Sequence, residues 1–449
     1  MKRKNKNPLT TMQVRIYPDG VQCNELAQIF GCCRVTYNTL LELQNNLYKD
    51  AIASTPEGEK VKSPYMNVSE MNKYFHANML KDEDRPWLCD HNSNVLKNEI
   101  NNLDSAFKRH FKGKGGKPNF KDKYDDQSAK FNRGTGISKN NLKNGMISLT
   151  KELKDIKFKT SRKYRDYIIN NSEHLMSVTV SKNKAGEYHA SLLFDSPQTL
   201  SNENIKEPTN QSCGVDLGVK TLAVTSYGEE YDNKRFLDEA EKRLKKYDRK
   251  ISRTKPHSNR RKKLLKKRNK LHAKVTDKRI DYIHNVTTDI VSKNQVIGIE
   301  DLNVKGMMRN HNIAKALQDA SLGEFRRQLT YKCEKYGRTL VVINRYYPSS
   351  KKCSCCGRVK KKLLLSERTY VCEHCGLVMD RDLNAAKNIE KEALRMLSEQ
   401  QKAVKDDEDK VGWWPAEVKP VLCSSVNGDT TDSSLEVMPG SVTEMIHYL

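Results

Sequence analysis

Apolar positions recur with a helical period in the first part of the chain and with a period of two after it. Over 25–51 and again over 95–112, apolar side chains are three and four residues apart, which predicts two amphipathic helices. A short apolar run before them ends at Pro18 and is typical of a strand. Between 139 and 194 apolar and polar residues alternate, which predicts strands that include a hairpin turning at 183–186.

Short apolar segments alternate with helical ones in the second part, which follows a polar linker at 195–211. Strands are expected in 211–226, 294–302 and 338–348. A long basic segment at 236–294, broken near Pro256, predicts a helical hairpin, and 317–337 predicts a helix that ends at Gly337. This alternation is typical of an α/β layered domain.

Four cysteines occur as two Cys-x-x-Cys pairs, and a glycine follows each pair. The pairs are Cys353 with Cys356 and Cys372 with Cys375. Two such pairs about fifteen residues apart are typical of a structural zinc site with four sulfur ligands. Cys355 offers another register for the first pair, but the usual two-residue gap favours Cys353 and Cys356. We therefore expect one structural Zn²⁺.

Three acidic residues lie at positions where a carboxylate has an electrostatic consequence. Asp216 interrupts an apolar strand, Glu300 ends another, and Asp382 begins a helical run. A carboxylate within a strand is costly to bury unless a cation meets it, and a helix N-terminus favours an anion. Carboxylate oxygens suit Mg²⁺ or Mn²⁺, and two ions about 4 Å apart can act on a phosphodiester. The acids predict a two-metal nuclease or strand-transfer site, with Asp301 and the potential helix cap Asp380 as neighbouring alternatives.

An excess of basic residues indicates a polyanionic partner. The chain has 81 Lys and Arg against 56 Asp and Glu, a net charge of +25, which favours binding to nucleic acid or an acidic membrane surface. No apolar run is long enough to span a bilayer, and no secretory signal is recognised at the basic start. We expect a cytoplasmic protein with reduced cysteines and a disordered polar tail at 399–449.

Five segments, taken in order, resemble the signature segments of the TnpB family, transposon-associated relatives of compact type V CRISPR nucleases. They are GVDLGVKTLAV, VIGIEDL, YYPSSKKCSCCG, RTYVCEHCG and DRDLNAAKNI. The resemblance implies an α/β multidomain protein, in which a RuvC-like nuclease domain of RNase H fold carries an inserted zinc ribbon. A β-barrel wedge domain with an inserted helical recognition domain is expected before it. The implied boundaries are 1–18 and 113–200 for the wedge, 19–112 for the recognition domain, 201–345 and 377–398 for the nuclease domain, and 346–376 for the ribbon.

The resemblance also implies RNA-guided cutting of double-stranded DNA next to a short flanking motif. Asp216, Glu300 and Asp382 match the family's metal-binding acids, and the four paired cysteines match its zinc ligands. Arg368 resembles a basic residue near the scissile phosphate, and Asn384 matches a polar position that supports the site. In a basic protein of this kind, the expected phosphate contacts are Lys97, Lys112, Lys114, Lys117, Lys121, Lys123, Arg260, Arg261, Lys262 and Lys263.

Other functions stay open on the sequence alone. The chain could be a CRISPR-associated effector that uses a crRNA, or a zinc-ribbon DNA-binding protein without nuclease activity. A DNA-joining transposase of the tyrosine kind would need a His-x-His pair, and none of the eleven histidines is so spaced. The expected partners are therefore a guide RNA and target DNA, with no membrane, and either a monomer or a dimer is compatible with the sequence.

Overall fold

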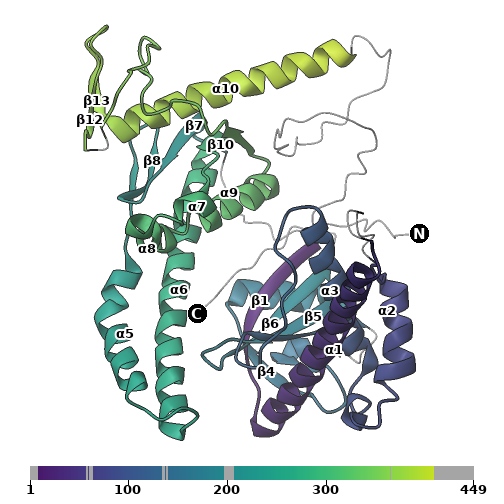
Figure 1. The fold of residues 1–449 in the computed structure, drawn as a ribbon. Coiled ribbons are helices and arrows are strands. Elements are labelled where there is room, and N and C mark those ends of the chain that lie inside the picture. The colour runs from purple at the N-terminus through teal and green to yellow at the C-terminus, as the bar shows by residue number, and fades with distance from the viewer. Residues whose placement is uncertain are drawn as a thin grey trace. The chain divides into compact units, whose positions relative to one another are not determined.

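The computed structural model describes residues 9–56, 59, 64–133, 137, 140–196, 207–364 and 366–408. They form two compact units (Figure 1). Unit 1 contains the described residues up to 201 together with 254–270, and unit 2 contains those of 202–253 and 271–439. Within the described ranges, no helix is long and apolar enough to cross a membrane.

Unit 1 is built on a six-stranded antiparallel sheet of order β2-β5-β6-β1-β4-β3. The strands are β1 Leu9–Tyr17, β2 Gln127–Asn132, β3 Met146–Ile147, β4 Ile156–Lys159, β5 Leu175–Lys182 and β6 Tyr188–Asp195. The predicted hairpin is formed by β5 and β6, and Gly186 takes a positive φ of 80° in its turn, which glycine does without strain. Closure of this sheet into a barrel stays a prediction.

The helices of unit 1 are α1 Gly20–Ala53, α2 Val68–Tyr74, α3 Ser93–Phe111 and α4 Arg162–Asn170. Asp19 begins α1 with a capping box: its carboxylate accepts from Gln22 N at 2.8 Å, and the Gln22 side chain accepts from Asp19 N at 2.9 Å. One hydrophobic core joins helix residues such as Leu40 and Leu96 to strand residues such as Phe131. Separate wedge and recognition domains therefore stay a prediction, because their expected boundary crosses this core.

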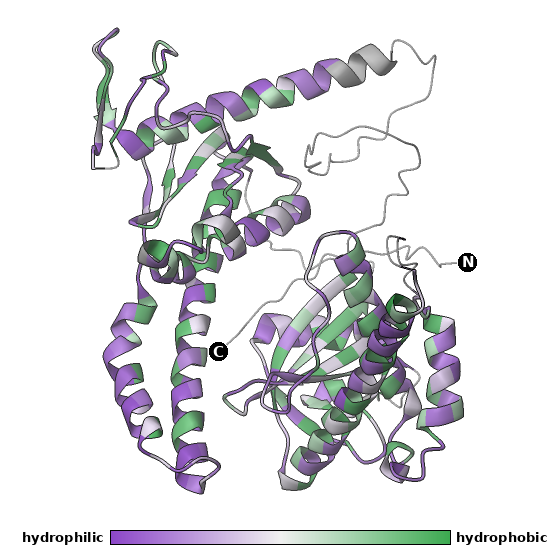
Figure 2. Cartoon of the chain, in the orientation of Figure 1, coloured by the Kyte–Doolittle hydropathy of each residue, from purple (hydrophilic) through white to green (hydrophobic). Residues whose placement is uncertain are grey.

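Unit 2 contains a five-stranded sheet of order β11-β10-β7-β8-β9. The strands are β7 Asn210–Leu217, β8 Thr221–Thr225, β9 Glu230–Asp232, β10 Asn294–Glu300 and β11 Thr339–Ile343. The first three form an antiparallel meander, and β10 and β11 run parallel to β7 on its other side. The predicted helical hairpin consists of α5 Phe236–Ser252 and α6 Asn259–Lys293, and Figure 2 shows α5 as mostly hydrophilic.

Different helices cover the two faces of this sheet (Figure 1). On one face, Val215 of β7 and Ile299 of β10 share a core with Ile290 of α6 and Phe325 of α9 Leu322–Tyr336. On the other face lies α10 Arg381–Glu408, whose Ile389 is fully buried against β11. Between β11 and α10 the chain forms a small hairpin of β12 Thr369–Val371 and β13 Val378–Asp380.

Two predicted boundaries differ from the structure. The helix expected over 317–337 is interrupted at Ser321, where φ is +49°, so that α8 His311–Ala320 and α9 Leu322–Tyr336 are separate; serine and the nearby Gly323 are weak helix formers. Gly337 ends α9 in a left-handed conformation as predicted. A disordered tail was expected from 399, but α10 continues to Glu408. Residues 409–449 lie outside the described residues.

Candidate active site

The register of two strands brings two of the predicted acids to the same end of the sheet in unit 2. β10 pairs in parallel with β7, with Gly298 opposite Gly214 and the next residues paired as well. Asp216 and Glu300 each lie two residues beyond their glycine. Because side chains alternate along a strand, each acid is on the same face as its glycine. That face is the one covered by α10.

Helix α10 lies directly against the two glycines. A Cβ atom at Gly214 would be 2.0 Å from the carbonyl oxygen of Ala386, and one at Gly298 would be 2.7 Å from the Cβ atom of Ala393. Only glycine permits so close an approach of helix and sheet. Asp382 lies about one helical turn before Ala386, so the packing brings the beginning of α10 toward the ends of β7 and β10.

The three carboxylates repel one another. Burial raises the pKa of Asp216 to about 8, together with the negative charges of Glu300 and Asp382. Burial also raises the pKa of Glu300, although Ser349 Oγ donates a hydrogen bond to its carboxylate. A divalent cation between the acids would remove this repulsion and favour their charged forms. The donor set fits Mg²⁺ or Mn²⁺, and the charges of Glu300 and Asp382 are near enough to act on Asp216. Among the described residues, however, only the four cysteines have all their ligand atoms within 4.8 Å of one another. A metal site formed by the three acids therefore stays a prediction.

Asp301 and Asp380, the alternative candidates for the acidic site, have other hydrogen-bond partners. Asp301 accepts hydrogen bonds from Arg326 Nη1 at 2.5 Å and Arg345 Nη2 at 2.6 Å; burial opposes the shift, but these arginines lower the pKa of its carboxyl. Asp380 Oδ1 accepts from the backbone N of Asp382 at 2.8 Å and of Leu383 at 3.0 Å. Its predicted ability to cap the helix is confirmed.

Arg368 and Asn384 connect the hairpin to the acidic site. Arg368 Nη1 is 3.8 Å from Asp382 Oδ2, and the carbonyl oxygen of Arg368 accepts from Arg381 N at 2.7 Å. The fully buried Asn384 accepts from Ser354 N at 2.9 Å and donates to the carbonyl oxygen of Lys352 at 2.8 Å. Asn384 therefore positions the first cysteine pair on α10.

Asn388, which the sequence reasoning did not identify, extends this attachment by one turn of α10. Its Nδ2 donates to the carbonyl oxygens of Ser349 at 2.8 Å and Lys352 at 2.6 Å. The spacing of two asparagines four residues apart was the available signal, because such residues share one helix face. Together the two amides hold the segment that carries Ser349, the hydrogen-bond donor to Glu300.

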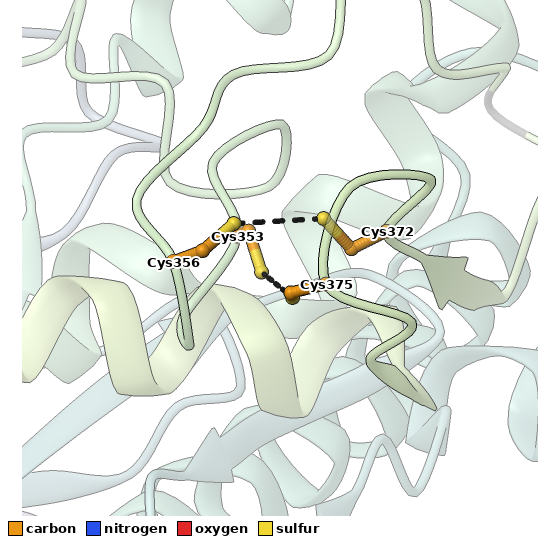
Figure 3. Close-up of side chains that lie close together, drawn as sticks. All are labelled: Cys353, Cys356, Cys372 and Cys375. Atoms are coloured by element: carbon orange, nitrogen blue, oxygen red, sulfur yellow. Dashed lines mark hydrogen bonds between the residues drawn. The ribbon is translucent and has the colours of Figure 1, made fainter.

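The four predicted cysteines form one cluster (Figure 3), and their sulfur atoms all lie within 4.8 Å of one another. Cys353 Sγ is 3.6 Å from Cys375 Sγ, and Cys356 Sγ is 3.7 Å from Cys372 Sγ. Four sulfurs arranged tetrahedrally at the usual Zn–S distance would be about 3.8 Å apart. The cluster therefore fits one Zn²⁺, and Cys355, which is exposed and outside it, is not a member.

The two cysteine pairs have the same backbone shape. In the first, Gly357 N donates to the carbonyl oxygen of Cys353 at 3.0 Å, and in the second Gly376 N donates to that of Cys372 at 2.9 Å. Both glycines have positive φ angles, 77° and 72°, which L-residues with a side chain adopt reluctantly. Backbone N–H groups of Cys375 and His374 lower the pKa of the Cys372 thiol to about 6, which favours the thiolate that binds metal.

The residues predicted to contact phosphates have different environments. Lys112, Lys114 and Lys117 are exposed beyond the end of α3. Lys121 instead forms an ion pair with the buried Glu99, and its Nζ is 4.3 Å from the ring centroid of Tyr37. The remaining ones are exposed or half-buried: Lys97, Lys123, Arg260, Arg261, Lys262 and Lys263.

Three family models match the chain. Residues 195–311 match one described as a probable transposase, 323–389 match one described as a Cas12f1-like TNB domain, and 9–52 match a helix-turn-helix domain. In this structure, the last range consists of β1 and the continuous helix α1.

Curated relatives match most of the chain. A protein of Streptomyces pristinaespiralis named "Putative RNA-guided DNA endonuclease" is 34% identical, over 84% of this chain and 87% of its own. A protein of Escherichia coli (strain K12) named "Putative RNA-guided DNA endonuclease InsQ" is 26% identical, over 85% of this chain and 91% of its own. TnpB-like protein L79 of Acanthamoeba polyphaga mimivirus is 35% identical over 41% of this chain and 38% of its own.

Proposed function

The chain belongs to the TnpB family, and we propose that it is an RNA-guided endonuclease that cuts double-stranded DNA. Two relatives carry the name putative RNA-guided DNA endonuclease, and both align with most of this chain. The net charge of +25 suits binding to RNA and DNA.

The observation that carries the proposal is the convergence of Asp216, Glu300 and Asp382. Two parallel strands and one helix carry these acids, and burial raises the pKa of Asp216 together with the negative charges of the other two. In unit 2, an antiparallel meander is followed by parallel strands on the other side of its first strand. This arrangement supports a RuvC-like nuclease domain of RNase H fold.

The proposed chemistry is hydrolysis of a phosphodiester without a protein nucleophile. Two Mg²⁺ or Mn²⁺ ions held by the three carboxylates would activate a water molecule and stabilise the leaving 3′ oxygen. The chain itself holds the carboxylates in place through α10. In this proposal Arg368, whose guanidinium is 3.8 Å from Asp382, contacts the scissile phosphate. Asn384 supports the site through its hydrogen bonds to Ser354 and Lys352 beside the first cysteine pair.

The remaining parts of the chain are assigned to nucleic-acid binding in this proposal. A guide RNA pairs with the target and selects the sequence, while basic residues hold phosphates irrespective of sequence. The wedge and recognition functions belong to unit 1, and the zinc ribbon at 346–376 helps to hold the strand near the acids. We propose that the protein works in the cytoplasm of a prokaryotic cell, where the target DNA is accessible.

The proposal is tested by expressing the full chain together with the 3′ flanking region of its own gene and sequencing the RNA that copurifies. The complex is then given a plasmid with a sequence that matches this RNA. We expect Mg²⁺-dependent cutting at the matched sequence, and Asp216→Ala should abolish it while RNA binding persists. A preparation that binds no RNA, or cutting that survives Asp216→Ala, would contradict the proposal.

A matched control is Asp232→Ala in the same sheet. Asp232 lies on β9, its side chain is 77% exposed, and its carboxylate pairs with Lys234 at 3.4 Å. This variant should cut like the unchanged protein. The sequenced RNA also separates the alternatives, because a CRISPR-associated effector would carry a crRNA transcribed from a repeat array, and a regulator without nuclease activity would bind DNA and never cut it.

A further inference from the structure

A short loop is connected to Glu300 at both of its ends. The loop at 344–349 begins after Ile343, which is the partner of Glu300 in the β10–β11 ladder. It ends at Ser349, whose hydroxyl donates a hydrogen bond to the Glu300 carboxylate. Both ends of the loop are therefore attached to the same acid of the proposed active site, and the residues between them must lie close to it.

The loop is a defined turn. Tyr347 N donates to the carbonyl oxygen of Asn344 at 3.0 Å, and Tyr346 N donates to Asn344 Oδ1 at 2.9 Å, so the asparagine side chain closes the turn from within. Arg345 attaches the turn to Asp301, donating from Nε to the backbone carbonyl oxygen at 3.1 Å and from Nη2 to the carboxylate at 2.6 Å. These four hydrogen bonds hold the turn in one conformation.

The two tyrosines of the turn have opposite environments. Tyr347 packs against the core of β11 and α10, and its hydroxyl accepts from Lys352 Nζ at 3.1 Å. Tyr346 is 87% exposed, the highest value among the large apolar and aromatic side chains that are exposed in the described residues. A single exposed aromatic is common on protein surfaces, but this one is held by a rigid turn beside an acid of the proposed site.

We propose that Tyr346 is a positioning residue that stacks on a base of the DNA strand being cut. The inference rests on the proposed nuclease function and adds a contact to it. An aromatic ring stacks on any base, because every base presents a π face. That tolerance suits an enzyme whose target sequence is chosen by pairing with RNA. Stacking on a base beside the scissile bond would hold the phosphate in register with the three acids.

The test uses the full-length protein in complex with its guide RNA and a matched DNA duplex under single-turnover conditions. Tyr346→Ala and Tyr346→Leu should lower the maximal cutting rate by roughly 5- to 100-fold, the effect expected for one lost base–aromatic stack. Tyr346→Phe should keep the rate within about 2-fold, since the ring alone stacks. The complex concentration that gives half-maximal cutting should not change, because pairing with the guide determines binding. Melting temperatures of all three variants should match that of the unchanged protein.

A substrate series shows whether the ring acts through a base. After the cut position has been mapped, single abasic nucleotides are placed at each position near it. One or two positions should slow the unchanged protein and have no further effect on Tyr346→Ala. Equal cutting by Tyr346→Ala, or an abasic effect that simply adds to that of the variant at every position, would overturn the inference. If the unchanged complex does not cut at all, the proposed function fails instead, and the two failures are distinguishable.

Discussion

Unit 2 contains the cluster of four cysteines and the three acids proposed to bind metal ions, and the chain positions the two sets in different ways. The four cysteines come from one stretch, and backbone hydrogen bonds within each Cys-x-x-Cys turn shape the pairs. The three acids lie on β7, β10 and α10, and their relative positions depend on the packing of α10 on the glycines of the sheet. The thiolate cluster is therefore mostly local, whereas the carboxylate cluster depends on tertiary structure.

The difference teaches where each cluster is vulnerable. Backbone N–H groups favour the Cys372 thiolate, and the two Cys-x-x-Cys turns hold the four sulfur atoms within 4.8 Å of one another. For the acids, burial and the charges of Glu300 and Asp382 raise the pKa of Asp216, and a bound cation would favour the charged forms. A change in the contact between α10 and the sheet should therefore displace the acids and leave zinc binding intact. A substituted cysteine should weaken zinc binding first and affect the acids only as a consequence.

The largest effect is expected for Gly214→Ala. The new Cβ atom would be 2.0 Å from the carbonyl oxygen of Ala386 and 2.5 Å from the backbone N of Glu390, so α10 must move. Displacing Asp382 by about 1 Å is enough to cost roughly 10²-fold in rate, and overpacking costs about 1–3 kcal/mol in stability. We expect guide-dependent cutting to become undetectable or nearly so, while metal analysis still finds one zinc per chain.

The matched control is Gly323→Ala, because nothing lies within 4 Å of a Cβ atom at this position in α9. Replacing an exposed helical glycine by alanine should stabilise the protein slightly, by up to about 1 kcal/mol, and leave cutting unchanged. If Gly214→Ala cut normally, the helix–sheet contact would not be what assembles the acids.

The second largest effect is expected for a substitution in the four-cysteine cluster. Cys372→Ser removes one of four thiolate ligands, so we expect zinc content to fall well below one per chain and the melting temperature to drop by more than about 5 °C. Cutting should fall as a consequence of the loosened hairpin. The control Cys355→Ser changes an exposed cysteine outside the cluster and should keep zinc and melting temperature. Loss of zinc in that variant would mean that the ligand register has been misassigned.

A third variant, Arg368→Ala, tests whether the positive charge beside Asp382 affects the cutting rate without affecting the stability of the fold. The Arg368 side chain is about half exposed, and its pair with Asp382 is 3.8 Å long, so its loss should change stability by less than about 1 kcal/mol. If its charge contacts the scissile phosphate, the cutting rate should fall by roughly 10²-fold. Arg368→Lys should recover part of that loss. A normal rate for Arg368→Ala would leave the residue with a structural role only.

The sequence predicted the local cluster more completely than the tertiary one. Cys-x-x-Cys spacing and the following glycines specify a turn by themselves, so they are enough to determine which cysteines pair. For the acids, strand and helix positions suggested candidates, but the close approach of α10 to Gly214 could not be foreseen. Such contacts depend on which element packs on which face, and the helical and strand periods do not contain that information.

The fold shows the same division between local and distant interactions. The β5–β6 hairpin and the C-terminal end of α9 were predicted because Gly186 and Gly337 mark them in the sequence. The short strand β2 and the helix α4 were not recognised, since neither has a long periodic pattern and both are stabilised by the core they join. Asn388 was also missed, because its role depends on carbonyl groups far away in sequence.

The smallest effect we predict links the two clusters. Asn384→Ala removes the amide that accepts from Ser354 N and donates to the carbonyl oxygen of Lys352. Ser354 N then loses this acceptor in a buried position, at a cost of about 1–3 kcal/mol, while the carbonyl oxygen of Lys352 keeps the hydrogen bond from Asn388. Zinc should stay bound, because the cysteine turns are intact, while cutting falls by roughly 10-fold as the hairpin shifts relative to Asp382. Asn384→Asp keeps an acceptor for Ser354 N, so its cutting rate and stability should lie between those of Asn384→Ala and those of the unchanged protein. If cutting were unchanged while stability dropped, the attachment would be structural alone, and the thiolate cluster would not influence the acids through α10.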